Sequence, residues 1–186
     1  QASKAIKHMK DNAELYNIDP AQVFTVGFSA GGHLAASLGA MWDLKEIYDE
    51  VDMPYGYNKP AGMILMYPVL TGDFYQASFK NLWLTPNPSE EQLRLVNIPN
   101  HICKDSSPAF ILHTCTDEAV DVRGSLALAN ALADQQIPFE MHIYPFGEHG
   151  LSTVDGVVCA EEKAPNVARA RKWVDDVKSW LKMMGV

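Results

Sequence analysis

The chain has 186 residues, of which 47% are apolar and 20% are charged, and its formal net charge is −8. This composition excludes a disordered or collagen-like chain and is typical of a single globular domain spanning residues 1–186. The acidic balance argues against a nucleic-acid partner, which would need a basic patch. The sequence contains no apolar run of about 18 residues, the length that a membrane-spanning helix would need.

The cysteines bear on the cellular compartment of the protein, and the first residue bears on where the natural chain starts. Three widely spaced cysteines, Cys103, Cys115 and Cys159, show neither a metal-binding spacing nor a pairing pattern. We therefore expect no bound metal, and we expect reduced thiols in a cytoplasmic protein. The chain starts at Gln1 rather than Met, and no signal-peptide block follows, so Gln1 need not be the natural first residue.

Apolar periodicity and turn residues divide the chain into helices and strands. In chain order we predict a helix at 2–17, a strand at 23–26, a helix at 30–42, a loop at 43–60, a strand at 63–67, an irregular insertion at 69–106 with a short helix after Pro88, a strand at 108–115, a helix at 122–135, a strand at 139–144 and a helix at 166–183. The strand runs are continuously apolar, which is typical of a parallel sheet with helices on both faces. The predicted fold class is therefore α/β, with about four strands.

One motif lies at the junction between the first predicted strand and the helix after it. The sequence GFSAG occupies residues 27–31 and is followed by Gly32. In this context a Gly-x-Ser-x-Gly pattern predicts a sharp turn that lifts the serine hydroxyl to a helix N-terminus. We expect Gly27 and Gly31 to let the strand and helix pack closely. Ser29 is the predicted nucleophile, and the alternative is a chance Gly-Ser-Gly turn.

A serine nucleophile needs a base and an acid that orients the base. Asp117 and His149 each follow the carboxyl end of a predicted strand, at the sheet edge where Ser29 also lies. We predict Asp117 as the acid, with Glu118 and Asp121 as alternatives, and His149 as the base. Asp121 is also suited to cap the helix that follows it.

The remaining histidines rank below His149. We expect His8 on an exposed helix face and His142 within a strand, and His113 is expected to pack inside its strand. His33 follows Ser29 by one helical turn, so it either lines the pocket or has a structural role. His101 lies in the insertion and has a smaller chance of approaching the site from above.

Three blocks, GFSAGGHLAA, PAFILHTCTDEAVDV and IPFEMHIYPFGEHGL, resemble the α/β-hydrolase esterases of the acetyl-xylan esterase and carbohydrate acetyl-esterase type. The resemblance extends from Val23 to the final helix. It implies a catalytic triad of Ser29, Asp117 and His149, with the Ala30 N–H as one oxyanion donor. It also implies hydrolysis of short acyl esters, often on sugars, with no cofactor.

The chain departs from that family in its N-terminal part. In the family several strands precede the nucleophile strand, and a glycine-rich loop donates a second oxyanion N–H; neither has a counterpart here. We therefore expect a truncated α/β-hydrolase fold, with the first strand at an open sheet edge that invites pairing, for example in a dimer. We also expect that this chain alone is a weak esterase or inactive.

Two alternative functions stay open at this point. A peptidase related to prolyl oligopeptidase shares the fold and a similar motif, although Ala30 and the short chain favour an esterase. An inactive hydrolase remnant is the other alternative. The insertion at 69–106 is expected to form a cap, where Phe74, Tyr75, Phe79 and Trp83 either line a pocket or, more often in such clusters, form the core of the cap itself.

Overall fold

The computed structural model describes residues 1–72, 77–154 and 165–186. In this part of the chain, the centre is a 4-stranded sheet with the order β1-β2-β3-β4. The strands are β1 (Phe24–Phe28), β2 (Gly62–Met66), β3 (Ala109–Thr114) and β4 (Phe139–Tyr144). Each neighbouring pair is parallel. The predicted α/β class with a parallel sheet is confirmed.

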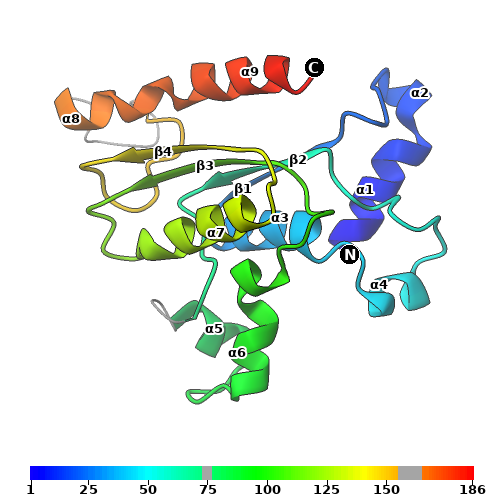
Figure 1. Ribbon diagram of the computed structural model, residues 1–186, viewed down its shortest axis with the longest axis horizontal. Coiled ribbons are helices and arrows are strands. Elements are labelled where there is room, and N and C mark those ends of the chain that lie inside the picture. The colour runs from blue at the N-terminus through cyan, green and yellow to red at the C-terminus, as the bar shows by residue number, and fades with distance from the viewer. Residues whose placement is uncertain (73–76, 155–164) are drawn as a thin grey trace.

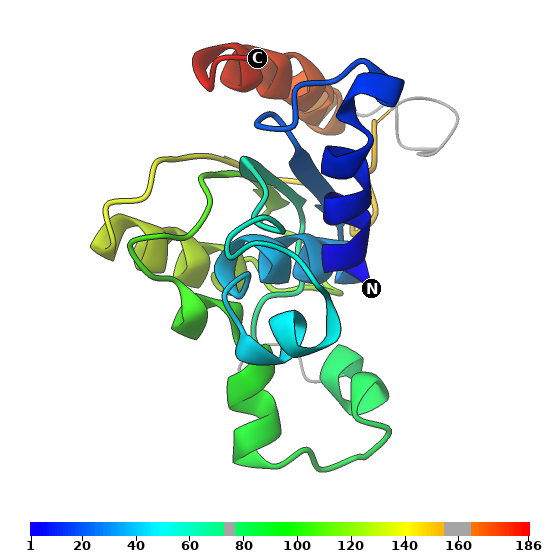
Figure 2. The same ribbon diagram turned by 90° about the vertical axis from the view of Figure 1, so that its right-hand side faces the viewer.

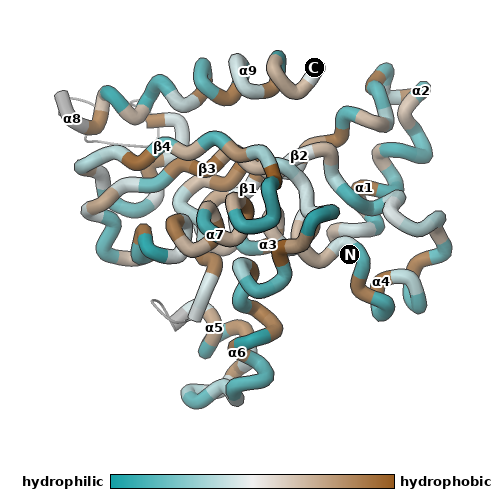
Figure 3. The backbone as a smooth tube through the Cα atoms, viewed as in Figure 1, coloured by the Kyte–Doolittle hydropathy of each residue, from teal (hydrophilic) through white to brown (hydrophobic). Residues whose placement is uncertain are grey.

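Helices cover both faces of the sheet, as predicted (Figure 1). The helices α3 (Ala30–Ala40) and α7 (Arg123–Asp134) lie on one side, and α9 (Trp173–Met183) lies on the other (Figure 2). Colouring by hydropathy places hydrophobic stretches along the central strands (Figure 3). These strands are buried on both sides because helices on each face exclude water from them.

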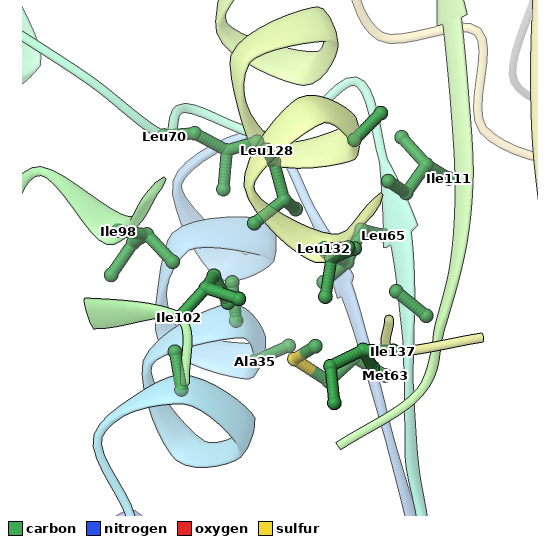
Figure 4. Close-up of a cluster of buried hydrophobic side chains, with 14 residues drawn as sticks. Ala35, Met63, Leu65, Leu70, Ile98, Ile102, Ile111, Leu128, Leu132 and Ile137 are labelled. Atoms are coloured by element: carbon green, nitrogen blue, oxygen red, sulfur yellow. The ribbon is translucent and has the colours of Figure 1, made fainter. Parts of the chain in front are cut away.

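Two apolar clusters fill the spaces between the sheet and its helices. The cluster beneath α3 and α7 includes Ala35, Met63, Leu65, Ile111, Leu128 and Leu132 (Figure 4). The cluster beneath α9 includes Ile64, Met66, Phe110, Leu112, Trp173, Val177 and Trp180. Successive residues of β2 alternate between the two clusters, as the period of a strand requires. The strands of this two-sided core carry the loops of the site at their carboxyl ends.

Several helices are shorter than the sequence predicts. The predicted helix at 2–17 is divided at Asn12 into α1 (Ala2–Asp11) and α2 (Ala13–Tyr16). The predicted helix at 166–183 consists of α8 (Pro165–Ala168), the 3-10 turn η3 (Ala170–Lys172) and α9. The predicted loop at 43–60 contains a further helix, α4 (Lys45–Glu50). None of these differences moves a strand of the sheet.

The insertion at 69–106 contains α5 (Ala77–Leu82), α6 (Glu90–Val96) and the 3-10 turn η1 (Ile98–His101). The predicted helix after Pro88 is confirmed: Ser89 and Gln92 form a reciprocal capping box at the start of α6. Phe79 is 2% exposed and packs in a small cluster with Val69, Val96 and Val120. Phe79 therefore belongs to the core of the insertion, while Phe74 and Tyr75 lie outside the described residues.

The predicted position of the first strand at a sheet edge is confirmed, because β1 has a neighbouring strand only on its β2 side in the described sheet. Val26 of β1 is 55% exposed, and Leu34 of α3 is 54% exposed. The helix α3 is thus buried through Ala35, Ala36 and Ala40, while Leu34 on its other side is exposed. Among the described residues, no helix has the length and apolar character needed to cross a membrane.

Candidate active site

Ser29 joins β1 to α3 with φ 54° and ψ −121°. A positive φ is uncommon for a residue with a side chain, so the surrounding structure has to hold this backbone in place. The Ser29 N–H donates to the Met66 carbonyl at 3.0 Å, and the Ser29 carbonyl accepts from the Val69 N–H at 3.1 Å. The strained turn is therefore fixed by the chain at the end of β2.

Two of the three glycines in the motif are required by close packing. A Cβ atom on Gly27 would lie 2.1 Å from the Gly31 carbonyl oxygen, and one on Gly32 would lie 2.7 Å from Cβ of Pro68. The Gly31 backbone takes part in the contact with Gly27, but a Cβ atom on Gly31 itself would meet nothing within 4 Å outside its own helix, so the expectation that this position needs a glycine is wrong. Gly32 is crowded because the chain leaving β2 turns at Pro68 against that side of α3.

The structure brings the three predicted site residues together. The Nε2 atom of His149 lies 2.8 Å from Oγ of Ser29, and Nδ1 lies 2.7 Å from Oδ2 of Asp117. The three residues follow the carboxyl ends of β1, β3 and β4. With Nδ1–H donating to the carboxylate, Nε2 is left as an acceptor for the serine hydroxyl. This arrangement can take a proton from Ser29 when its oxygen attacks an electrophile.

Asp117 is held as a buried anion. Its side chain is 1% exposed, and Oδ1 accepts from the backbone N–H groups of Ala119 at 2.9 Å and Val120 at 2.8 Å. Burial acts to raise the pKa of Asp117. Hydrogen bonds from His113, His149 and the Val120 N–H outweigh that effect and lower the pKa from 3.8 to about 2. The carboxylate is therefore ionised at neutral pH.

The alternative acids lie in other surroundings. Asp121 accepts from the Arg123 backbone N–H at 2.8 Å and from Nη2 of Arg123 at 2.6 Å. The N-cap position of α7 is Val122, so Asp121 lies one residue before the position predicted for it. The Arg123 hydrogen bond lowers the pKa of the Asp121 carboxyl. Glu118 is exposed. Of the three candidate acids, Asp117 is the one that the structure hydrogen-bonds to His149.

Four other histidines have partners of their own. His8 bonds to the hydroxyl of Tyr16 at 2.8 Å, and His142 pairs with Glu140 at 2.7 Å. His101 donates to the Leu95 carbonyl at 3.0 Å, so it lies against α6 and not above the site as considered from the sequence. His33 bonds to the Val69 carbonyl at 2.9 Å and packs against Phe79, which favours its structural role. Burial lowers the pKa of His33.

Sequence reasoning missed a set of hydroxyl groups that hold the His149 loop. The Thr114 hydroxyl donates to the Gly147 carbonyl at 2.7 Å, and the Gly147 N–H donates to Oγ1 of Thr116 at 2.9 Å. Gly147 has φ 151°, and a Cβ atom on it would lie 2.8 Å from Cγ2 of Thr114. Both threonines flank the end of β3 beside Asp117, and that placement was the available signal. They tie the loop of the base to the loop of the acid.

The surroundings of His149 include an aromatic ring and an open pocket. The ring of Tyr67 lies edge-on to the His149 ring, with centroids 5.0 Å apart. A cavity of about 530 Å³ adjoins His149 and is lined by Thr116, Glu118, Ala119, Glu148 and His149. Within the described ranges, no three His, Cys, Asp or Glu side chains are grouped so as to hold a metal ion. Cys103 and Cys115 are free, and Cys159 lies outside those ranges.

Comparison with known families decides the relationship of the chain. The profile of the family described as BD-FAE matches residues 2–132. The chain belongs to the BD-FAE family. The matched part of this BD-FAE chain contains Ser29 and Asp117, while His149 follows it.

Two curated proteins are similar to the BD-FAE chain in sequence. It is 36% identical over 155 residues to endo-1,4-beta-xylanase B of Butyrivibrio fibrisolvens, covering 82% of this chain and 24% of the xylanase. It is 26% identical over 155 residues to an acetylxylan esterase of Xylanibacter ruminicola, covering 76% of this chain and 28% of the esterase. The chain thus spans about a quarter of the length of these relatives.

Solved structures share the fold. An acetyl ester-xyloside bifunctional hydrolase from Caldicellulosiruptor lactoaceticus aligns with a TM-score of 0.75 and 30% identity, covering 95% of this chain and 64% of that one. The carboxylesterase Cest-2923 from Lactobacillus plantarum WCFS1 aligns with a TM-score of 0.81 and 25% identity, covering 98% of this chain and 66% of that one. Nearly all of the BD-FAE chain therefore corresponds to part of an α/β-hydrolase fold found in esterases.

Proposed function

We propose that this BD-FAE chain is a serine hydrolase that cleaves short-chain carboxylic esters, acetyl esters of sugars or xylan in particular, through an acyl-enzyme. The observation that carries the proposal is the position of His149 between Ser29 at 2.8 Å and Asp117 at 2.7 Å. The preference for acetyl esters rests on the acetylxylan esterase and the acetyl ester-xyloside hydrolase among its relatives.

The first half of the reaction transfers the acyl group to Ser29. As Oγ of Ser29 attacks the ester carbonyl carbon, its proton passes to Nε2 of His149. The new carbon–oxygen bond turns the carbonyl oxygen into an oxyanion. Asp117 stays ionised and stabilises the imidazolium through its bond to Nδ1. The imidazolium then gives its proton to the leaving alcohol as the ester bond breaks.

The oxyanion is assigned to the N-terminus of α3. Ala30 is the first residue of this helix, so its N–H has no carbonyl within the helix to bond to. This N–H and the positive end of the helix dipole favour negative charge next to Ser29. The Ala30 N–H is therefore the proposed oxyanion donor.

The second half of the reaction regenerates the enzyme. The neutral imidazole of His149 takes a proton from water, and the hydroxide oxygen attacks the acyl carbon. The carboxylic acid leaves as Oγ of Ser29 recovers its proton from His149. These steps use side chains and water alone, so the proposal includes no cofactor.

The cavity beside His149 is the proposed site of the alcohol part of the ester. Its volume of about 530 Å³ can hold a sugar unit, and Thr116, Glu118 and Glu148 line it with hydroxyl and carboxylate oxygens. These oxygens can accept hydrogen bonds from sugar hydroxyl groups. The two carboxylates repel anionic alcohols, so a neutral sugar fits this cavity best.

Acetate release tests the proposal. We expect the chain to hydrolyse p-nitrophenyl acetate and to release acetate from acetylated xylan, but slowly, because the second oxyanion donor of the family has no counterpart here. We expect Ser29→Ala to remove this activity. An aminoacyl p-nitroanilide in the same assay separates an esterase from a peptidase. Equal ester hydrolysis by the wild-type chain and Ser29→Ala would contradict the proposal.

A further inference from the structure

His113 is a fully buried histidine that the proposed mechanism does not use. It lies on β3 with a side chain 0% exposed, four residues before Asp117. A buried imidazole requires partners for both ring nitrogens, because an unpaired polar atom away from water is unfavourable. The identity of those partners connects His113 to the site.

The contacts of His113 define its tautomer. Its Nε2 atom lies 2.9 Å from the Val120 carbonyl oxygen and 3.4 Å from Oδ2 of Asp117. Both oxygens are acceptors, so Nε2 carries a proton. The Nδ1 atom lies 2.8 Å from Oγ of Ser125, a serine of α7 that is 0% exposed. The Ser125 hydroxyl can donate to Nδ1, and the proton on Nε2 is directed at the turn at residues 117–120, which we call the acid loop.

The acid loop is held by hydrogen bonds of Val120. The Val120 N–H donates to Oδ1 of Asp117 at 2.8 Å, while the Val120 carbonyl accepts from His113. Oδ1 also accepts from the Ala119 N–H at 2.9 Å. Oδ2 is left facing Nδ1 of His149 at 2.7 Å, and Nε2 of His113 lies 3.4 Å from it. A shift of Val120 would therefore change the direction in which Oδ2 points.

We propose that His113, oriented by Ser125, is a positioning residue that holds the 117–120 turn so that Oδ2 of Asp117 faces His149. The inference rests on the proposed function, because it concerns the acid of the proposed triad. His113 touches no reacting atom and acts through Asp117 alone. Ser125 selects the tautomer in which Nε2 donates, as a hydrogen bond to the other nitrogen does in other histidine sites.

If His113 had only a packing role, its replacement would have a different effect on the kinetics. Its loss would lower stability while the remaining folded molecules worked at the normal rate. Loss of a positioning residue lowers kcat and leaves KM nearly unchanged, because the carboxylate stabilises the imidazolium that exists only along the reaction. The two roles can therefore be separated by kinetics on folded protein.

The kinetic test uses three variants of the full chain and one control, with p-nitrophenyl acetate as substrate. We expect Ser125→Ala to lower kcat about tenfold and His113→Phe about 100-fold, with KM unchanged. His113→Gln keeps a side-chain N–H donor, so it should retain more activity than His113→Phe. The control is Ser107→Ala, which removes another hydroxyl that is 0% exposed and donates to the Pro60 carbonyl at 2.7 Å. Ser107→Ala should keep the wild-type kcat.

A second readout does not depend on turnover. The titratable groups facing the Asp117 carboxyl are His113, His149 and Tyr67. Burial raises the pKa of this carboxyl, and the bonds from His113, His149 and Val120 lower it to about 2. Carbon-13 NMR should find the pKa of Asp117 higher by about one unit in His113→Phe and unchanged in Ser107→Ala. Nitrogen-15 NMR should find the Nε2–H tautomer of His113 in the wild-type chain.

The outcomes separate the inference from the proposed function. If the wild-type chain shows no Ser29-dependent hydrolysis, the proposed function fails, and the two NMR measurements still decide whether His113 acts on Asp117. If His113→Phe fails to fold, Ser125→Ala and His113→Gln decide the question. The inference is overturned if these variants keep the wild-type kcat and the wild-type pKa of Asp117, whatever their stability.

Discussion

Asp117 links the pH dependence of stability to the geometry of the site. Burial raises its pKa, but bonds from His113, His149 and the Val120 N–H lower it from 3.8 to about 2. A carboxyl with a lowered folded-state pKa contributes stability above its unfolded value, and this contribution is lost as pH falls toward the folded value. A shift of this size corresponds to about 2 kcal/mol.

Asp117→Asn tests this linkage at a single residue. We expect the variant to be less stable than the wild-type chain by about 2 kcal/mol at neutral pH, with the difference disappearing as pH falls toward about 2. Urea unfolding of both proteins across this range measures the difference. Glu118→Gln is the control, because this neighbouring carboxylate is exposed and should show little change. A difference that stays constant with pH would contradict the electrostatic account.

Contact between β1 and α3 depends on individual glycines. A Cβ atom on Gly27 would lie 2.1 Å from a backbone oxygen of α3, whereas one on Gly31 would meet nothing within 4 Å outside its own helix. We expect Gly27→Ala to cost about 3 kcal/mol of unfolding free energy through overpacking. Gly31→Ala should be neutral or stabilising by up to about 1 kcal/mol, because alanine favours the helix. Similar losses in both variants, measured by urea unfolding, would show that the packing is described wrongly.

At the scale of elements, the sequence predicts the strands better than the helices. The runs at Met63–Met66 and 109–112 are continuously apolar, which is typical of strands buried on both faces, and both lie in strands. Helix ends depend on local backbone choices that no apolar pattern records. Asn12 divides the first predicted helix although the apolar residues continue past it at helical spacing. The helix α4 was missed because it buries no residue of its own.

In the site too, the sequence predicts which residues meet but not the individual contacts around them. The order of Ser29, Asp117 and His149 along the chain, each after a strand end, predicts that they meet, and the structure places them within hydrogen-bonding distance. The bonds of His113 could not be predicted, because the sequence shows a histidine in a strand without showing which atoms face its ring. Gly31 and Gly32 are adjacent, and only the path of Pro68 shows which of the two is crowded.

The open edge of β1 is a feature of the described sheet as a whole. This edge carries Val26, 55% exposed, and has no strand beside it on that side in the described sheet. Unpaired backbone groups on an apolar edge favour pairing with another chain. We propose that two copies associate through this edge at high protein concentration.

Light scattering across a concentration series measures that association. We expect the mass of the wild-type chain to rise with concentration and Val26→Lys to remain monomeric, since a lysine on an edge strand opposes pairing. Leu84→Lys places the same charge on a residue that is 92% exposed and distant in the chain, so it should behave as the wild type does. A wild-type chain that stays monomeric throughout the series would argue against the dimer.

Covalent labelling tests the central claim most directly, namely that Ser29 is a nucleophile activated by His149. A fluorophosphonate probe reacts with a serine only when its hydroxyl is activated, so labelling reports the working state of the site without a choice of substrate. Mass spectrometry of the full chain is predicted to find one adduct on Ser29, lost in Ser29→Ala and strongly slowed in His149→Ala. Absence of labelling in the folded wild-type chain, or equal labelling in His149→Ala, would contradict the account.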